Sequence, residues 1–297
     1  MEKVRRDTQW LMASRPSLRL GSIGFQCSPG KSGDCTIGQR WHWSMVGVIL
    51  VAMSERLNLS GRKALVTGAA GAVAQVVARD LKNRGAYVIG MDRSALHETH
   101  FFDGVIEVDL GSSSIPSIPC PVEDLDAVIH LAGRALPEEA ESPGSLPERS
   151  VIEQTINDNF MSVVDVVAIT RPALTSNSSI TVVSSINSLR AFGLPIYSAA
   201  KGAVNAFVIS IAPQLLAEGI RINAVALGTV ERTGGRDRRA AGRKVFRKLS
   251  KTIPDGRPLT TEEASRSILS VGIDSPGISG SVTVVDRGQS NFVNLGR

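Results

Sequence analysis

The stretch KALVTGAAGAVAQVVARDLKNRGAYVIGMD, residues 63–92, decides the fold because two short β-branched runs flank a helical pattern. The runs Lys63–Thr67 and Tyr87–Met91 have the length and composition of buried strands. Between them, apolar residues recur at the spacing of one helix face until Gly85 ends the segment. That apolar face consists of Val73, Val76, Val77 and Leu81. The stretch therefore predicts a strand, a crossover helix and a second, parallel strand.

The same alternation of short strands and helices continues toward the C-terminus and predicts an α/β fold with a doubly wound parallel sheet. Further strands are predicted at Val105–Val108, Ala127–Leu131, Ile180–Ser184, Arg221–Val225 and Ser281–Val285. A long helix is predicted from Tyr197 to Leu215, and the short stretch before Leu131 predicts that the third crossover lacks a full helix. The 297 residues, 42% of them hydrophobic, suit one core, so a single domain of about seven strands is predicted at residues 53–297.

The first 52 residues differ in composition from the rest. All three tryptophans lie there, and Met53 opens a plausible natural start that leads into the first strand. We interpret residues 1–52 as a disordered extension or the product of an upstream start codon, with a targeting or regulatory tail as the alternative. The apolar run Met45–Met53 is about half the length that crosses a bilayer, so no membrane span is predicted.

The formal charge of +5 is concentrated in two segments. Residues 1–52 carry +4 and residues 231–251 carry +7, which leaves −6 for the rest of the chain. A general nucleic-acid-binding surface is therefore not expected. The three cysteines, Cys27, Cys35 and Cys120, show no CxxC spacing, so we predict free thiols, a cytoplasmic location and no metal site.

A small-residue turn, Thr67–Ala74, joins the first strand to its helix. Such a turn lets the backbone approach a pyrophosphate, while the helix N-terminus supplies N–H groups and the positive end of its dipole. Asp92 stands at the end of the next strand, where an acid accepts hydrogen bonds from ribose hydroxyls and repels a 2′-phosphate. This favours NAD(H) over NADP(H), although Arg93 beside it weakens that preference.

Tyr197 and Lys201 lie one helical turn apart on the same helix face. A free tyrosine, with a pKa of about 10, is a poor base at neutral pH. A neighbouring lysine cation favours the phenolate and brings the group closer to the range needed for acid–base catalysis.

These motifs, in this order, resemble the short-chain dehydrogenase/reductase family from about Leu57 to the C-terminus, and the resemblance implies a Rossmann-type sheet. The matching residues are Thr67–Ala74, Asp92, Asp109, Leu110, Leu131–Gly133, Asn159, Ser184, Ser185, Tyr197, Lys201 and Arg221–Val225. By resemblance, Tyr197 exchanges a proton with the substrate oxygen, Lys201 lowers the tyrosine's pKa and binds the nicotinamide ribose, and Asn159 fixes a water. The implied cofactor contacts are Gly68, Gly71, Ala72, Val73, Asp92, Arg93, Asp109, Leu110, Ala132, Gly133, Tyr197, Lys201, Thr229 and Val230.

Several positions depart from the family pattern or leave alternatives open. The strand ending favours Ser185 as the catalytic serine, whereas the separation from the tyrosine favours Ser184; we prefer Ser185 with a loop shortened by one residue. Asn157 competes with Asn159 for the asparagine role. His130 leans toward the extended, sugar-nucleotide branch, but we interpret it as a structural strand-end residue.

Chain length favours the standard branch, because the 96 residues after Lys201 are too few for a larger substrate domain. The resemblance implies interconversion of a secondary alcohol and a ketone, with residues 229–258 closing over the substrate. The basic residues of that segment predict either a solvated helix or an anionic substrate. Alternative functions are sugar-nucleotide epimerase or dehydratase chemistry, or a non-catalytic dinucleotide-binding protein. A homodimer or homotetramer is also expected from the family.

Overall fold

Seven parallel strands form one sheet in the order β3-β2-β1-β4-β5-β6-β7. The computed structural model describes residues 58–96, 100–112, 123–140, 146–190, 192–231 and 246–291. The strands are β1 (Lys63–Thr67), β2 (Tyr87–Asp92), β3 (Gly104–Glu107), β4 (Leu125–His130), β5 (Leu174–Ser185), β6 (Arg221–Leu227) and β7 (Val282–Val285). The strand order reverses between β1 and β4, and in such sheets ligands bind at the carboxyl ends of the strands beside that point. The predicted doubly wound parallel sheet is confirmed.

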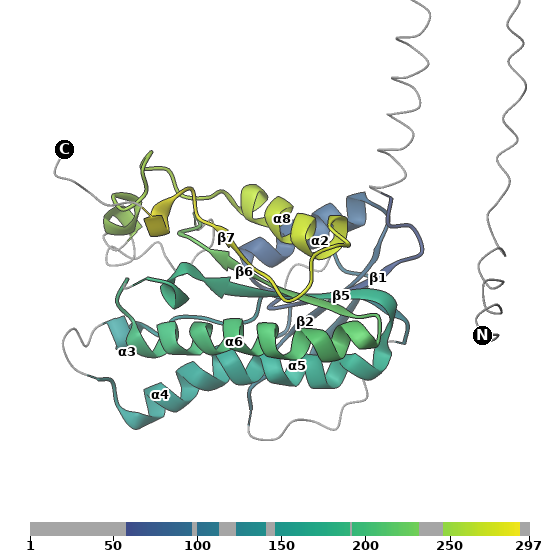
Figure 1. Ribbon diagram of the computed structural model, residues 1–297, viewed down its shortest axis with the longest axis horizontal. Helices are drawn as coiled ribbons and strands as arrows, with labels where there is room; N and C mark the ends of the chain where they lie inside the picture. Colours follow the sequence, from purple (N-terminus) through teal and green to yellow (C-terminus); the bar gives the residue numbers. More distant parts are fainter. Residues whose placement is uncertain are drawn as a thin grey trace, which may run out of the picture. The chain divides into compact units, whose positions relative to one another are not determined.

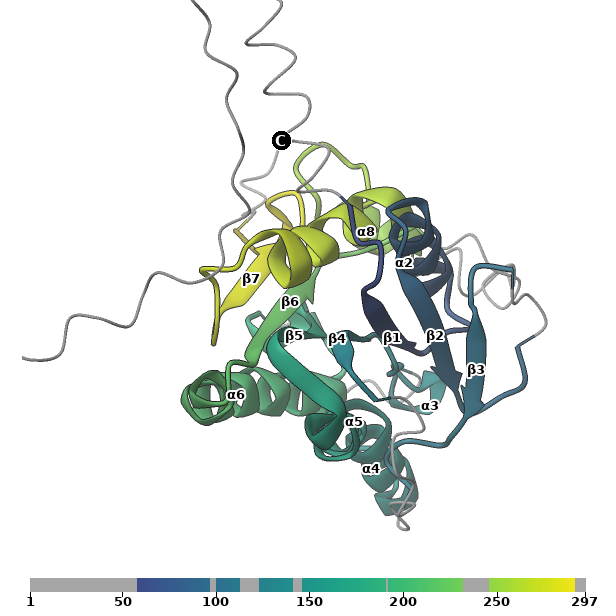
Figure 2. The same ribbon diagram turned by 90° about the vertical axis from the view of Figure 1, so that its right-hand side faces the viewer.

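Helices cover both faces of the sheet (Figures 1 and 2). One face carries α2 (Ala72–Asn83) and α8 (Thr261–Leu269); the other carries α4 (Arg149–Ile156), α5 (Ser162–Thr170) and α6 (Pro195–Ala217). Shorter helical segments are α3 (Pro137–Ala140), η1 (Asn157–Met161), η2 (Arg171–Ala173), η3 (Ile186–Ser188), η5 (Ser270–Asp274) and η6 (Gln289–Asn291), and residues 246–250 are also helical.

The alternating pleat of the strands divides the core into two apolar layers. Ala64 and Val66 of β1 pack in the layer beneath α2 and α8, whereas Leu65 packs with Val163 of α5 and Val204 of α6. β1 is thus apolar on both sides, as expected for an interior strand when helices cover both faces of a parallel sheet.

The seven strands and the long helix lie where the sequence predicts them, with differences at their ends. β5 begins at Leu174, six residues before the predicted Ile180, and its early part includes exposed Asn177 in a left-handed conformation. That part lacks the apolar run that marks a buried strand, so the sequence pattern missed it. Among the described helices, α6 alone has the length and apolar composition to cross a membrane, but its buried face packs in the core.

Several predictions fall outside the described residues. These are the assignment of residues 1–52, the run Met45–Met53, the three cysteines and most of the basic segment, residues 232–245. The described residues between β3 and β4 contain no helix, but residues 113–122 of that crossover are also outside, so its predicted lack of a helix stays a prediction.

Candidate active site

The turn after β1 lies against the end of β4. Gly68 adopts a φ of +64°, and a Cβ there would come within 2.8–2.9 Å of backbone atoms of Leu131 and Ala132. The turn thus needs glycine for both its conformation and its close approach. Gly71 is the N-cap of α2 and provides no side-chain cap, so the first turn of the helix is left for an anion. Ala72 and Val73 begin that helix, as the cofactor prediction requires.

Asp92 ends β2 and faces the same turn. Its carboxylate accepts hydrogen bonds from the Ala70 amide at 3.0 Å and from the Ser94 amide and hydroxyl at 3.2 and 3.0 Å. Arg93 points elsewhere, because its guanidinium is paired at 3.7 Å with Asp158 of η1. Asp158 also binds Arg134, with 2.7 Å between Oδ2 and Nε.

Asp109 and Leu110 follow β3 at the same edge of the sheet. Leu110 is buried and Asp109 is exposed. The next residue, Gly111, is held by the buried Asp165 of α5, whose carboxylate accepts its N–H at 2.8 Å. The loop after β3 is therefore held in place by a side chain of α5.

Lys201 is buried in the first half of α6, one turn after Tyr197. Its Nζ donates to the Val183 carbonyl at 3.0 Å and lies 5.8 Å from the centre of the Tyr197 ring. Burial lowers the pKa of Lys201 to about 8. At neutral pH the group is still mostly protonated, so a cation stands beside the tyrosine.

Gly133, three residues after the end of β4, lies against Asn159 and Lys201. Its φ is +138°, and a Cβ would come 2.8 Å from Asn159 Oδ1 and 3.2 Å from Lys201 Nζ. Asn159 is fully buried in η1, where its Nδ2 donates to the carbonyls of Arg134 and Thr155. Its Oδ1 has no hydrogen-bond partner among the described residues, so an acceptor remains available beside Lys201.

Packing separates the alternative residues that the sequence left open. The Ser184 hydroxyl donates to the Lys201 carbonyl at 3.3 Å inside the core, whereas Ser185 stands at the end of β5, where its hydroxyl is bonded only to Asn187. The Asn159 Oδ1 lies with Lys201 Nζ beside Gly133, whereas the contact given for Asn157 is that of its backbone carbonyl with Gly111. The geometry therefore favours Ser185 and Asn159 over their neighbours.

His130 is completely buried at the end of β4. Its Nδ1 lies 2.8 Å from the Thr67 hydroxyl and its Nε2 3.4 Å from that of Ser162. Burial, and to a lesser degree the charge of Lys201, lowers the pKa of His130 to about 3. A ring that stays neutral between two hydroxyls fits the predicted structural role and not that of a catalytic base.

Thr229 and Val230 follow β6 and are joined to the far end of the predicted substrate loop. Val230 forms a parallel bridge with Leu259. Gln289 accepts from the Thr229 amide at 2.9 Å and donates to the hydroxyls of Thr229 and Thr252 at 3.0 and 2.8 Å. Sequence reasoning missed this glutamine, because no motif marks it.

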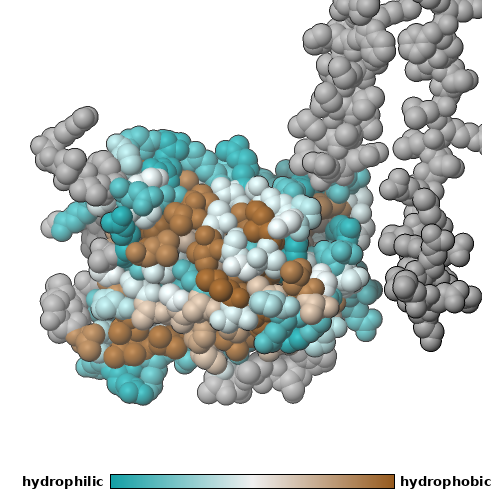
Figure 3. Space-filling model, viewed as in Figure 1, coloured by the Kyte–Doolittle hydropathy of each residue, from teal (hydrophilic) through white to brown (hydrophobic). Residues whose placement is uncertain are grey.

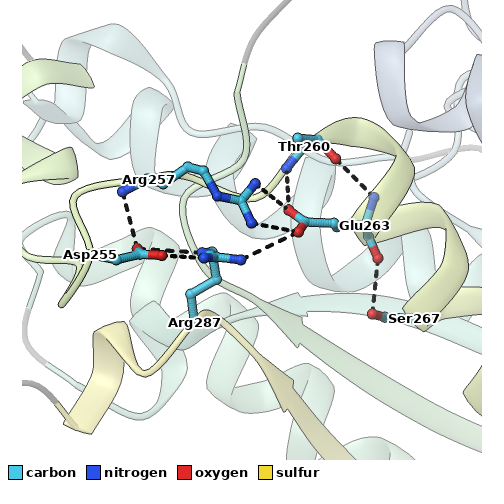
Figure 4. Close-up of polar contacts among 6 residues, drawn as sticks. All are labelled: Asp255, Arg257, Thr260, Glu263, Ser267 and Arg287. Carbon is cyan, nitrogen blue, oxygen red and sulfur yellow. Dashed lines mark hydrogen bonds and ion pairs between the residues drawn. The ribbon is translucent and has the colours of Figure 1, made fainter.

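An ion-pair network fixes the segment that follows the loop (Figure 4). Glu263 at the start of α8 binds Arg257 and Arg287, and Arg287 also binds Asp255. Glu263 further forms a reciprocal cap with Thr260. A cavity of about 470 Å³ between α8 and β7 borders this network, and no predicted site residue lines it.

Comparisons with known proteins agree with this architecture. The family described as enoyl-(acyl carrier protein) reductase matches residues 68–290. With its sheet and its site, the chain belongs to the short-chain dehydrogenase/reductase family, which confirms the resemblance read from the sequence.

Individual relatives differ in their activities. Carbonyl reductase [NADPH] 2 of Sus scrofa is 29% identical over 78% of this chain and 98% of its own length. Enoyl-[acyl-carrier-protein] reductase [NADH] FabI of Salmonella typhimurium is 27% identical over 78% of this chain and 95% of its own. A solved short-chain dehydrogenase/reductase from Burkholderia thailandensis has a TM-score of 0.68 at 25% identity, covering 79% of this chain and 94% of that one. The chain is thus an oxidoreductase of this family.

Proposed function

We propose that this chain is an NAD(H)-dependent oxidoreductase that interconverts a secondary alcohol and a ketone, with Tyr197 as the acid–base group. The observation that carries the proposal is the buried Lys201 cation beside the Tyr197 ring, at the carboxyl edge of β4 and β5. Few structural roles need a buried lysine without a carboxylate partner, since burying an unpaired charge is costly. A functional site repays that cost by tuning proton transfer.

The donors and acceptors around the site fit a dinucleotide. The uncapped N-terminus of α2 suits a pyrophosphate, the Asp92 carboxylate suits ribose hydroxyls, and Lys201 with Asn159 Oδ1 offers a donor and an acceptor near the reacting end. Bound there, the nicotinamide supplies or accepts the hydride.

The protein's own residues handle the proton and the developing charge. The Tyr197 hydroxyl gives its proton to the substrate oxygen during ketone reduction, and the Tyr197 phenolate takes the proton of the substrate hydroxyl during alcohol oxidation. The Lys201 cation stabilises the phenolate left behind. The Ser185 hydroxyl turns from Asn187 to hydrogen-bond the substrate oxygen as charge develops on it.

The tyrosine is tested by Tyr197→Phe with Tyr87→Phe as control, because the chain has two tyrosines and Tyr87 is half-exposed at the opposite end of its strand. Activity is followed by the nicotinamide absorbance change with a panel of secondary alcohols and ketones. We expect Y197F to lose a factor of at least about 10² in turnover while NADH binding stays within about threefold, and Y87F to behave as wild type. Full activity in Y197F would refute the assignment.

We propose NAD(H) over NADP(H) because the Asp92 carboxylate lies beside the turn after β1, where it would meet the adenosine ribose, and because Arg93 is paired with Asp158. A 2′-phosphate would meet the negative charge of Asp92, and the one basic residue next to it in sequence, Arg93, is already paired with Asp158. We therefore expect a lower Kd for NADH than for NADPH in fluorescence titrations. Asp92→Asn should lower the ratio of the Kd for NADPH to the Kd for NADH by roughly tenfold or more. If this ratio of Kd values does not change, Asp92 does not determine the cofactor preference.

Reduction of a carbon–carbon double bond in a thioester is a second candidate, favoured by the matched family description and the enoyl reductase relatives. The basic residues of the predicted substrate loop, residues 229–258, would draw in an anionic carrier or coenzyme A thioester. Turnover of crotonyl-coenzyme A that exceeds that of every ketone would select this reaction. An apparent affinity that does not change between low and moderate ionic strength would argue against an anionic substrate.

We further propose a homodimer or homotetramer formed through α6. Figure 3 shows apolar side chains gathered over α6 and around β7. Ile209 and Leu216, two turns apart on α6, are each about half exposed. Ile209→Glu should shift the mass measured by light scattering toward the monomer. The predicted cytoplasmic location, and the absence of nucleic-acid and membrane partners, stay predictions.

A further inference from the structure

The helix that carries Tyr197 begins without a cap of its own. Its N-cap residue, Leu194, has a left-handed conformation with φ 57° and ψ 64° and forms no side-chain cap. The first helical residue, Pro195, has no N–H. The first amides that need an acceptor are therefore those of Ile196 and Tyr197.

Glu139 supplies that acceptor from a distant part of the chain. It lies on α3, which follows β4 by a few residues, and its side chain is 5% exposed. The Ile196 amide donates to Glu139 Oε1 at 2.6 Å, and the Tyr197 amide donates to Oε1 and Oε2 at 3.2 and 3.3 Å. No lysine or arginine in the described part of the chain forms an ion pair with Glu139, so its charge is matched by these amides and the helix dipole.

One short segment thus contacts both members of the acid–base pair. Gly133, directly after β4, packs against Lys201 Nζ and Asn159, and six residues later Glu139 binds the amide of Tyr197. Lys201 is held independently by the Val183 carbonyl. Without Glu139, the first turn of α6 loses its acceptor while Lys201 stays fixed one turn further along.

We propose that Glu139 is a positioning residue of the active site, which holds the Tyr197 phenol in register with Lys201 by binding the backbone amide of the tyrosine itself. This inference rests on the proposed role of Tyr197. It predicts that loss of the carboxylate lowers the rate of the chemical step and leaves cofactor binding intact, because the hydrogen bonds of Glu139 go to the start of α6 and not to α2 or Asp92.

The experiment compares Glu139→Ala with Glu139→Gln and with a matched cap deletion, Thr260→Ala. Thr260 caps α8 with an equivalent side-chain bond to a helix amide, and it is not among the residues assigned to the cofactor or to proton transfer. The readouts are kcat with the best substrate of the alcohol and ketone panel, the Kd for NADH, and Tm. We expect E139A to lose about tenfold to a hundredfold in kcat with the Kd for NADH within about threefold. E139Q keeps an amide oxygen that accepts the same N–H and should recover most of the rate.

T260A should lower Tm to a similar extent and leave kcat unchanged. Equal kcat in E139A and wild type, or losses of kcat in E139A and T260A that follow Tm alone, would overturn the inference. If E139A does not fold, Glu139→Asp is used instead, because it shortens the side chain by one methylene and so withdraws the carboxylate. Its kcat should lie between those of wild type and Y197F. A wild-type kcat in this variant would also overturn the inference.

Hydrogen exchange provides a readout that needs no substrate. The amides of Ile196 and Tyr197 should exchange faster in E139A than in wild type, whereas those near Lys201 should be unchanged. Unchanged protection of both amides contradicts the inference even if no substrate is found. Full activity of Y197F, by contrast, contradicts the proposed function. It does not affect the hydrogen-exchange test, which asks only whether Glu139 holds the two amides.

Discussion

Replacing Gly68 by alanine should damage both stability and cofactor binding, and the structure contains a matched control at Gly61. Both glycines are left-handed, with φ of +64° at Gly68 and +80° at Gly61. An added Cβ at Gly61 meets nothing within 4 Å. At Gly68 it comes within 2.8–2.9 Å of three backbone atoms at the end of β4, which cannot rotate away as a side chain would.

The expected loss of stability differs between the two variants. A left-handed conformation costs an L-residue about 1–2 kcal/mol, and alanine regains about 0.4–1 kcal/mol by restricting the unfolded chain. Gly61→Ala should therefore lower the free energy of unfolding by about 0–1.6 kcal/mol. Gly68→Ala adds the cost of overpacking, about 1–3 kcal/mol, for a total of about 1–5 kcal/mol.

Urea denaturation of both variants measures the difference, and fluorescence titration with NADH measures its consequence. We expect only G68A to weaken NADH binding, by about tenfold or more, because the Cβ displaces the turn from the N-terminus of α2. Equal stability and equal NADH affinity in the two variants would refute the argument that close packing against β4 shapes the cofactor turn.

Two further predictions concern the catalytic serine and stability in acid. Ser185→Ala should lower kcat by about tenfold to a thousandfold while Ser184→Ala mainly lowers Tm, so the reverse pattern in paired assays would reassign the serine. A hydrogen bond from Arg287 lowers the pKa of Asp255 to about 2, and one from Arg257 lowers the pKa of Glu263 to about 2. Both pKa values lie below those of the unfolded chain. The stability that these two carboxylates contribute is therefore complete above about pH 5 and is lost as the pH falls toward 2. Arg287→Met should flatten the fall of the urea midpoint between pH 5 and 2, whereas Arg149→Met, which removes an exposed helix pair, should not.

The strands and the order of the family motifs were readable from the sequence because they are local. A buried parallel strand needs a continuous apolar run, and a crossover helix needs apolar residues at a 3.6-residue spacing. β1 therefore begins and ends at the predicted residues, Lys63 and Thr67. The start of β5 was missed because the register against β4 is irregular between Leu174 and Ser179, where the exposed Asn177 donates its backbone N–H to the Gly219 carbonyl at 2.8 Å. Backbone contacts of this kind are not reported by side-chain periodicity.

Alternatives one residue apart were decided only by packing. Ser184 and Ser185 have the same chemistry, but consecutive side chains of a strand point to opposite faces, so only one of them reaches the mouth of the site. Similarly, the side chain of Asn159 shares the surroundings of Gly133 with Lys201, whereas Asn157 contacts Gly111 through its backbone carbonyl.

The sequence by itself determined the class of fold, the family and the candidate groups Tyr197, Lys201 and Asp92, since each depends on a pattern within a few residues. Tertiary structure alone revealed what holds those groups. Glu139 lies 58 residues before the tyrosine amide that it binds, and Gln289 lies 60 residues after Thr229. Contacts of this kind leave no periodicity or spacing in the chain, because they depend on where separate loops return to one edge of the sheet.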